Sequence, residues 1–210
     1  MKTQIVSIMA GCFCAICFCP TRTEATLITI EVEGVVDDVY DPYGYLEGKI
    51  EVGTIIEGIY TYDPSVSRLP GHQYEFSFPC GVSLIAGGFK FETDPTRVDF
   101  AIGIGNNVSE GDGYFFISYR NIPLSAEVPV GGISWTLEDS TGKALLSDAL
   151  ATTAPVLEDW GFNRLNIGGG TRARPFGFLG HVTSAEVIPE PSTILFLCLG
   201  SLILRKRRYP

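Results

Sequence analysis

Few residues of this chain combine the side-chain types and the spacing that catalysis requires. The two histidines, His72 and His181, have no second metal ligand at a recognised spacing. Ser83 in GVSLI and Ser134 in GISWT lack the closing glycine of the Gly-x-Ser-x-Gly nucleophile elbow. Segment 103–108, GIGNNV, lacks the third glycine of a dinucleotide-binding loop. We therefore expect no catalytic residue and no cofactor-binding residue, and the chain is not predicted to be an enzyme.

Oxygen-bearing side chains gather in two segments, DDVYD at 37–41 and NNVSEGDG at 106–113. Ca²⁺ binds such oxygens, but neither segment follows the EF-hand spacing, and Asn, Asp and Gly are also the ordinary residues of turns. We interpret both segments as turns and expect no metal site, with calcium as the alternative. A pair of carboxylates can also hydrolyse a glycosidic bond. No pair stands out among the 24 acids, so a secreted enzyme acting on polysaccharide is the alternative function.

The segment YDPYGY, at 40–45, carries three tyrosines around Asp41. Tyrosine rings could stack on sugar rings while the carboxylate accepts hydrogen bonds from sugar hydroxyls. The interpretation that we favour is a folded-back loop whose tyrosines cover the edge of the fold. Cys80, in FPCGVS, is interpreted as a small buried residue near a turn rather than as a nucleophile.

The segments that must position these residues alternate as β-strands do. In 27–35, Ile28, Ile30 and Val32 alternate with polar residues, which predicts a strand with one solvated face. Similar runs, separated by turn residues, recur at 46–52, 54–62, 73–78, 87–93, 97–104, 114–120, 132–139, 162–170 and 176–187. This spacing predicts an all-β fold, an antiparallel, jelly-roll-like β-sandwich. Segment 143–151 fits either one helical turn or an edge segment.

The N-terminus has the pattern of a secretory signal. Lys2 precedes a run of apolar and small residues at 5–19, and a short polar segment then leads to Ala25. A basic start, an apolar helix and a small residue at the cleavage point predict export by Sec-type machinery, with cleavage after Ala25. The segment IMAGC, at 8–12, also resembles a bacterial lipobox, so lipidation at Cys12 is an alternative.

Charge and cysteine usage fit an exported domain. The formal net charge is −9, and several bases (Lys2, Arg22 and the cluster at 205–208) lie near the chain ends, which leaves the central part more acidic still. An acidic protein is repelled by phosphate backbones, so we expect no nucleic-acid partner. Of the six cysteines, Cys80 alone lies in the central part, so we expect no disulfide within that part.

The last residues, VIPEPSTILFLCLGSLILRKRRYP, combine three unlike elements. Pro189 and Pro191 lack amide donors and favour a stiff, extended segment. Ser192 or Thr193 can cap a helix over the apolar run 193–204, which is about 18 Å long against a hydrocarbon core of about 30 Å. Four bases follow the run: Arg205, Lys206, Arg207 and Arg208. Such bases stay on the cytoplasmic face, so the tail predicts a short membrane helix, either a temporary hold or a plain single-pass anchor.

This tail, on a chain that begins with a signal peptide, resembles the PEP-CTERM sorting signal of Gram-negative bacteria. The resemblance implies that Pro189, Glu190 and Pro191 are the sorting motif and that the bases at 205–208 are the stop-transfer cluster. It also implies that an exosortase, a membrane-embedded cysteine protease or transpeptidase, processes the tail. Such proteins are associated with exopolysaccharide and biofilm matrix. The processing cysteine belongs to the exosortase, so Cys198 takes no role.

Two stretches of the body, 48–66 and 137–150, are similar to segments of such exported β-domains, which implies a shared fold and no known activity. We therefore predict a signal peptide at 1–25, an exported β-sandwich domain at 26–186 and a sorting signal at 187–210. The protein is expected to cross the inner membrane transiently with one span and then to reach the cell surface or extracellular matrix. A structural or adhesive role is favoured there, with exopolysaccharide as a candidate partner.

Overall fold

The computed structural model describes residues 26–108 and 111–189, and within them the chain forms ten β-strands and one short 3-10 turn. The strands are β1 (Ile28–Tyr40), β2 (Ile55–Tyr62), β3 (Gln73–Phe76), β4 (Gly81–Ala86), β5 (Phe89–Glu92), β6 (Phe100–Val108), β7 (Gly111–Ser118), β8 (Val130–Asp139), β9 (Phe162–Thr171) and β10 (Arg174–Val187). The turn η1 (Leu157–Asp159) lies between β8 and β9. The predicted all-β class is confirmed, whereas the predicted signal helix and C-terminal hydrophobic helix lie outside the described residues.

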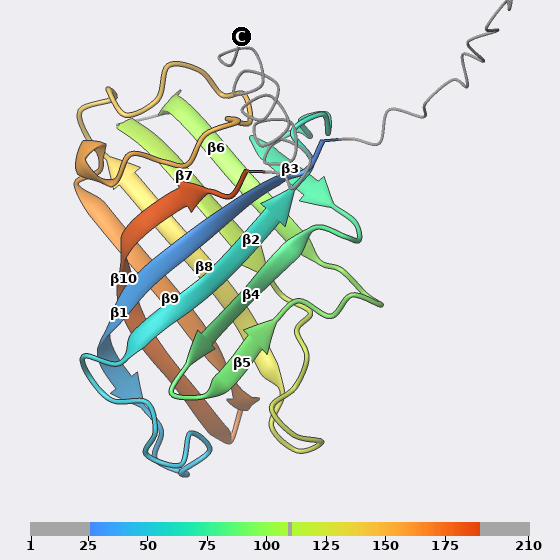
Figure 1. The fold of residues 1–210 in the computed structure, drawn as a ribbon, viewed down its shortest axis with the longest axis vertical. Coiled ribbons are helices and arrows are strands. Elements are labelled where there is room, and N and C mark those ends of the chain that lie inside the picture. Colours follow the sequence, from blue (N-terminus) through green and yellow to red (C-terminus); the bar gives the residue numbers. More distant parts are fainter. Residues whose placement is uncertain (1–25, 109–110, 190–210) are drawn as a thin grey trace, which may run out of the picture.

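The ten strands form one continuous antiparallel sheet in the order β3-β6-β7-β8-β9-β10-β1-β2-β4-β5. The sheet curls so that β1, β2 and β4 lie over β6 to β9 (Figure 1). The two facing halves belong to one sheet, because β10 and β1 pair along their length and join them. β-Bulges at Glu33/Gly34 and Val36/Asp38 interrupt this pairing, and bulges bend and twist a strand, which favours a curled sheet.

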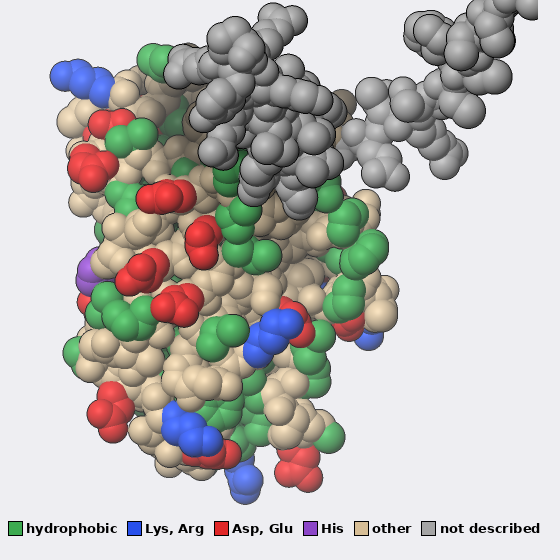
Figure 2. Space-filling view, in the orientation of Figure 1, with side chains coloured by type: hydrophobic (Ala, Val, Ile, Leu, Met, Phe, Trp, Pro, Cys, Tyr) green, Lys and Arg blue, Asp and Glu red, His purple; other side chains and the backbone are tan. Residues whose placement is uncertain are grey.

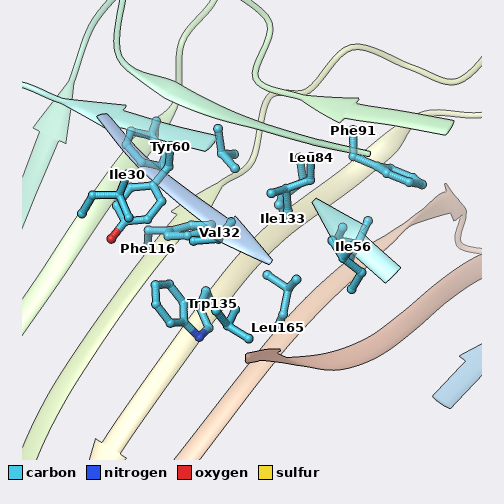
Figure 3. Packing of buried hydrophobic residues seen from close by; sticks show 14 of the residues in the cluster. Ile30, Val32, Ile56, Tyr60, Leu84, Phe91, Phe116, Ile133, Trp135 and Leu165 are labelled. Carbon is cyan, nitrogen blue, oxygen red and sulfur yellow. The ribbon is translucent and has the colours of Figure 1, made fainter. Parts of the chain in front are cut away.

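An aromatic core fills the space between the two halves of the sheet (Figure 3). The ring of Phe116 in β7 lies 4.9 Å from that of Tyr60 in β2 and 6.0 Å from that of Trp135 in β8. Polar atoms in this core are paired: the Tyr114 hydroxyl donates to the Tyr60 hydroxyl at 3.0 Å. Among the described residues, no buried side-chain nitrogen or oxygen lacks a hydrogen-bond partner. The core is therefore closed by packing and by internal hydrogen bonds.

Gly58 in β2 lets strand β4 approach closely. A Cβ atom built on Gly58 would lie 2.1 Å from the carbonyl oxygen of Ser83 and 2.7 Å from the Cα atom of Leu84. Both of these are backbone atoms, which cannot move aside as a flexible side chain can. The stretch 48–66, which the sequence singles out by its family likeness, therefore contains at least one residue with a clear packing reason.

The predicted strand at 46–52 is wrong, because this segment forms successive turns between β1 and β2. Leu46 and Ile50 are 1% and 3% exposed, so the apolar pattern does mark buried positions. The amide three residues after Leu46 donates back to its carbonyl at 2.9 Å, which is a turn and not a strand. Gly48 and Gly53 have φ values of 66° and 89°, a backbone conformation that strands do not use.

Candidate functional site at the sheet end that carries both termini

The described chain begins and ends at the same end of the sheet, which we call the terminal end. Strand β1 starts there and β10 finishes there, because they are antiparallel neighbours with Ile30 opposite Val187. The amide of Ile188 donates to the carbonyl of Thr29 at 2.9 Å. Figure 1 shows the start of β1 (blue) and the end of β10 (red) together at the upper end of the molecule. Pro189 follows directly and is exposed.

The described residues therefore include the first residue of the predicted sorting motif, Pro189, which comes directly after Ile188, the residue whose amide bonds to Thr29. The other predicted sites lie outside the described residues: Glu190, Pro191, the cluster Arg205 to Arg208, the cleavage site after Ala25, and Cys12.

A long connection between β8 and η1, residues 140–156, crosses the terminal end, and we call it the capping segment. The hydroxyl of Tyr62 in β2 donates to the carbonyl of Ala151, and the hydroxyl of Tyr74 in β3 donates to that of Asp148, each at 2.6 Å. Burial raises the pKa of Tyr62 to about 12. Segment 143–151, for which the sequence allows one helical turn or an edge segment, forms neither a helix nor a strand, and its backbone hydrogen-bonds to side chains of the sheet instead.

Two carboxylates of the sheet turn toward backbone amides at this end. Asp112 in β7 accepts hydrogen bonds from the amides of Asn107 and Leu145, at 2.8 and 2.7 Å. Asp139, the last residue of β8, has its pKa lowered to about 2, chiefly by the amide of Lys143, 2.9 Å from Oδ2. Asp112 and Asp139 are 4% and 5% exposed, so they serve the chain's own amides and anchor the capping segment.

A third carboxylate, that of Asp148, joins the capping segment to the loop at 63–72. It accepts a hydrogen bond from the amide of Asn106 at 2.7 Å and from Nη1 of Arg68 at 2.8 Å. The amide of Asn106 and the Arg68 guanidinium both lower the pKa of Asp148. His72 contacts Arg68, and its Nδ1 atom lies 4.0 Å from Oδ2 of Asp148. His72 is therefore part of the polar cluster that Arg68 and Asp148 form.

Several of the exposed side chains at the terminal end are apolar. Leu146, in the middle of the capping segment, is 99% exposed. The neighbouring Leu145 packs against the core, so Leu146 faces the opposite way. We call four exposed apolar residues of this end the apical surface: Leu69, Phe78, Leu146 and Ile188, which are 42%, 67%, 99% and 40% exposed.

A hollow of about 340 Å³ lies beside the point where the chain enters the sheet. Leu27, Val66 and Phe78 contribute apolar side chains to its lining, and Cys80 also lines it. Burial raises the pKa of the Cys80 thiol, and a thiol that stays protonated is a poor nucleophile. The burial of Cys80 directly before β4 fits the interpretation of a small residue near a turn.

The two oxygen-rich segments are not brought together. Residues 106–108 and 111–113 lie at the terminal end, whereas 37–41 lies at the opposite end, because β1 runs from one to the other. Asp37 contacts Nδ1 of His181 at 2.9 Å. In the ranges 26–108 and 111–189, no group of three or more His, Cys, Asp or Glu side chains is placed to hold a metal ion.

The tyrosine segment 40–45 forms a folded-back loop at the end of the sheet opposite the terminal end. Both carboxylate oxygens of Asp41 accept hydrogen bonds from backbone amides, those of Tyr45 and of the residue after it, at 2.9 and 2.6 Å. The ring of Tyr45 meets Phe176 edge-on at 6.1 Å, and the Tyr43 hydroxyl donates to the β9–β10 turn. These are the contacts of a loop that covers the sheet end.

Sequence reasoning missed the capping segment and its exposed leucine. The sequence singles out 137–150 through its family likeness but assigns it no role. Two signals were available there. An aspartate followed by Ser-Thr-Gly after a strand, as at Asp139, is typical of a turn held by its own carboxylate. A Leu-Leu pair in irregular chain, Leu145 and Leu146, also indicates that one side chain is buried and the other exposed.

Fold and site together define a class of protein: an all-β domain made of one curled antiparallel sheet, in which the described chain begins and ends at one end of that sheet. Comparison of the chain with protein-family models, with curated proteins and with solved structures finds no match. In the part of the chain that the structure describes, no helix is long and apolar enough to cross a membrane.

Proposed function

We propose that this protein is an exported cell-surface or extracellular-matrix protein that is sorted through a C-terminal PEP-CTERM signal. Sec-type machinery exports the chain and the signal peptide, 1–25, is removed. The tail, 187–210, then holds the chain in the inner membrane until an exosortase processes it near Pro189–Pro191. The released domain is structural or adhesive, without enzymatic activity, and associates with exopolysaccharide or biofilm. We also propose that the curled sheet has the architecture of a jelly-roll-like β-sandwich.

One observation carries this proposal: the buried core of the described domain ends before the sorting motif begins. The core residues run from Ile30 to Val182. The last backbone hydrogen bond to β1 is donated by Ile188, directly before Pro189. Cleavage after Pro189 therefore removes no core residue, whereas loss of one large buried side chain costs about 2–5 kcal/mol. A sorting signal that is cut off must be separable in this way.

The outer face of β10, β1 and β2 is acidic and supports the exclusion of nucleic acid (Figure 2). In the register of these strands Glu31 lies opposite Glu186 and Glu33 lies opposite Glu57. All four side chains are exposed. Such a face repels phosphate backbones, whereas a neutral polysaccharide meets no repulsion there.

Fractionation of the native host tests the proposal. Wild type is compared with Pro189→Ala/Pro191→Ala and with Pro123→Ala, a matched change at an exposed proline of the β7–β8 loop. We expect wild type and Pro123→Ala at the cell surface or in the medium, and the double variant in the membrane. If all three stay in the membrane, the tail is a plain single-pass anchor. Membrane retention that depends on Cys12 would assign the protein to the lipidated alternative.

A further inference from the structure

We propose that the apical surface lies in the headgroup layer of the membrane while the tail is inserted, so that the β-domain stands on the bilayer with its terminal end down. This inference rests on the proposed function and deepens it, because it names the lipid surface as a docking partner of the folded domain. The side chains that dock are those of the apical surface, Leu69, Phe78, Leu146 and Ile188.

The chain is too short for the domain to stand away from the bilayer. Ile188 is held on the sheet by its hydrogen bond to Thr29, and the predicted tail helix begins at Ser192 or Thr193. An extended chain covers at most about 3.6 Å per residue, so residues 189–193 span at most about 18 Å. The polar layer of one leaflet takes about 6 Å of that length. The terminal end therefore stays within about 12 Å of the headgroups.

The segment that follows the predicted signal peptide also enters the sheet at the terminal end. Thr29, the partner of Ile188, follows the predicted cleavage site after Ala25 by a few residues. Before cleavage, the signal peptide and the tail therefore leave the domain side by side. Two tethers at one end fix which end of the sheet meets the membrane, whatever the tilt of the domain.

The tip of this end has the chemistry of an interfacial surface. Three of its carboxylates are already paired, since Asp112 and Asp139 accept hydrogen bonds from backbone amides and Asp148 pairs with Arg68. Leu146, by contrast, exposes 99% of its surface to solvent. Moving one such leucine from water into an apolar phase raises affinity about tenfold to a hundredfold. Apolar side chains above satisfied polar groups suit the boundary between headgroups and acyl chains.

Attraction between charges does not explain this docking. The chain has a formal net charge of −9, so an anionic lipid surface repels it. Insertion of apolar side chains has no such dependence on lipid charge. We therefore assign the apical surface to a zwitterionic lipid surface, and phosphatidylcholine vesicles are a sufficient probe.

The test uses the full chain reconstituted in phosphatidylcholine vesicles. An environment-sensitive fluorescent amino acid is placed in separate preparations at position 146 in the apical surface, at position 52 or at position 198 in the tail. Val52 is a matched control, because it is an apolar residue, 70% exposed, in a turn at the opposite end of the sheet. Quenching is then measured with lipids that carry a nitroxide either at the headgroup or deep in the acyl chain.

The expected result is headgroup-level quenching at position 146, deep quenching at position 198 and none at position 52. Deep quenching at 198 without quenching at 146 would overturn the docking inference and leave the proposed membrane hold intact. Equal quenching at 146 and 52 would also overturn it, because the domain would then have no preferred end. Absence of quenching at 198 would overturn the membrane hold and the docking inference together.

Discussion

Replacing Asp112 with asparagine should loosen the capping segment. The carboxylate is 4% exposed, and its two oxygens accept hydrogen bonds from the amides of Asn107 and Leu145 at 2.8 and 2.7 Å. Asparagine is nearly the same size, but it offers one oxygen, so its NH₂ group must face one of these two amides. One donor is then left unpaired in a part-buried site, which costs about 1–3 kcal/mol.

Thermal unfolding measures this change, with Asp38→Asn as the control because Asp38 is exposed at the far end of β1. A chain of this size loses about 3 °C in Tm for each kcal/mol, so Asp112→Asn should lower Tm by about 3–9 °C. The control should stay within about 0.5 kcal/mol of wild type.

Hydrogen exchange locates the effect. The amide of Leu145 should exchange about five- to a hundredfold faster in Asp112→Asn, because about 1.4 kcal/mol corresponds to a factor of ten. Unchanged exchange at Leu145, together with a Tm equal to that of the control, would refute the reasoning that this carboxylate anchors the capping segment.

The remaining predictions concern packing and pH. Gly58→Ala would place a Cβ atom 2.1 Å from a backbone oxygen, so it should lower the free energy of unfolding in urea by about 1–3 kcal/mol. Gly113→Ala is the control, because its Cβ atom meets no atom within 4 Å, and equal effects of the two changes would contradict the close approach of β2 and β4. The lowered pKa of Asp139 stabilises the fold above the unfolded pKa near 4, so this contribution should disappear as the pH falls toward about 2, and the Asp139→Asn variant should show a flatter acid limb. Burial raises the pKa of Tyr62 to about 12 and also raises that of Tyr60, so these tyrosines ionise first in the unfolded chain and stability should fall between about pH 10 and pH 12. Tyrosinate absorbance and unfolding midpoints measure this fall, and a stability that stays constant across that range would show that these hydroxyls are not buried.

Local alternation predicted much of the sheet because one face of each strand is buried. In β1, Ile30 and Val32 are buried and the glutamates between and after them are exposed, as the sequence pattern requires. The same reasoning failed at 46–52, because turns at Gly48 and Gly53 can bury residues four apart as a strand does. Alternation reports burial, and it does not distinguish a strand from a series of turns.

The candidate site could be predicted in part. The tail residues and the cleavage site are local patterns, so the sequence alone yields them as predictions. Their place in space depends on the pairing of Ile30 with Val187, and no local pattern encodes contacts of such long sequence separation. Which leucine of the pair Leu145 and Leu146 is exposed could not be predicted either, since it follows from where the capping segment finds its hydrogen-bond partners.

The central claim, that the chain is released from a membrane by processing near Pro189, is tested most directly by the intact mass of the protein from its native host. The account predicts that protein at the cell surface or in the medium begins at Thr26 and ends close to the Pro189–Pro191 motif, so that both end segments are missing. A surface protein that retains the residues through Pro210 would contradict it.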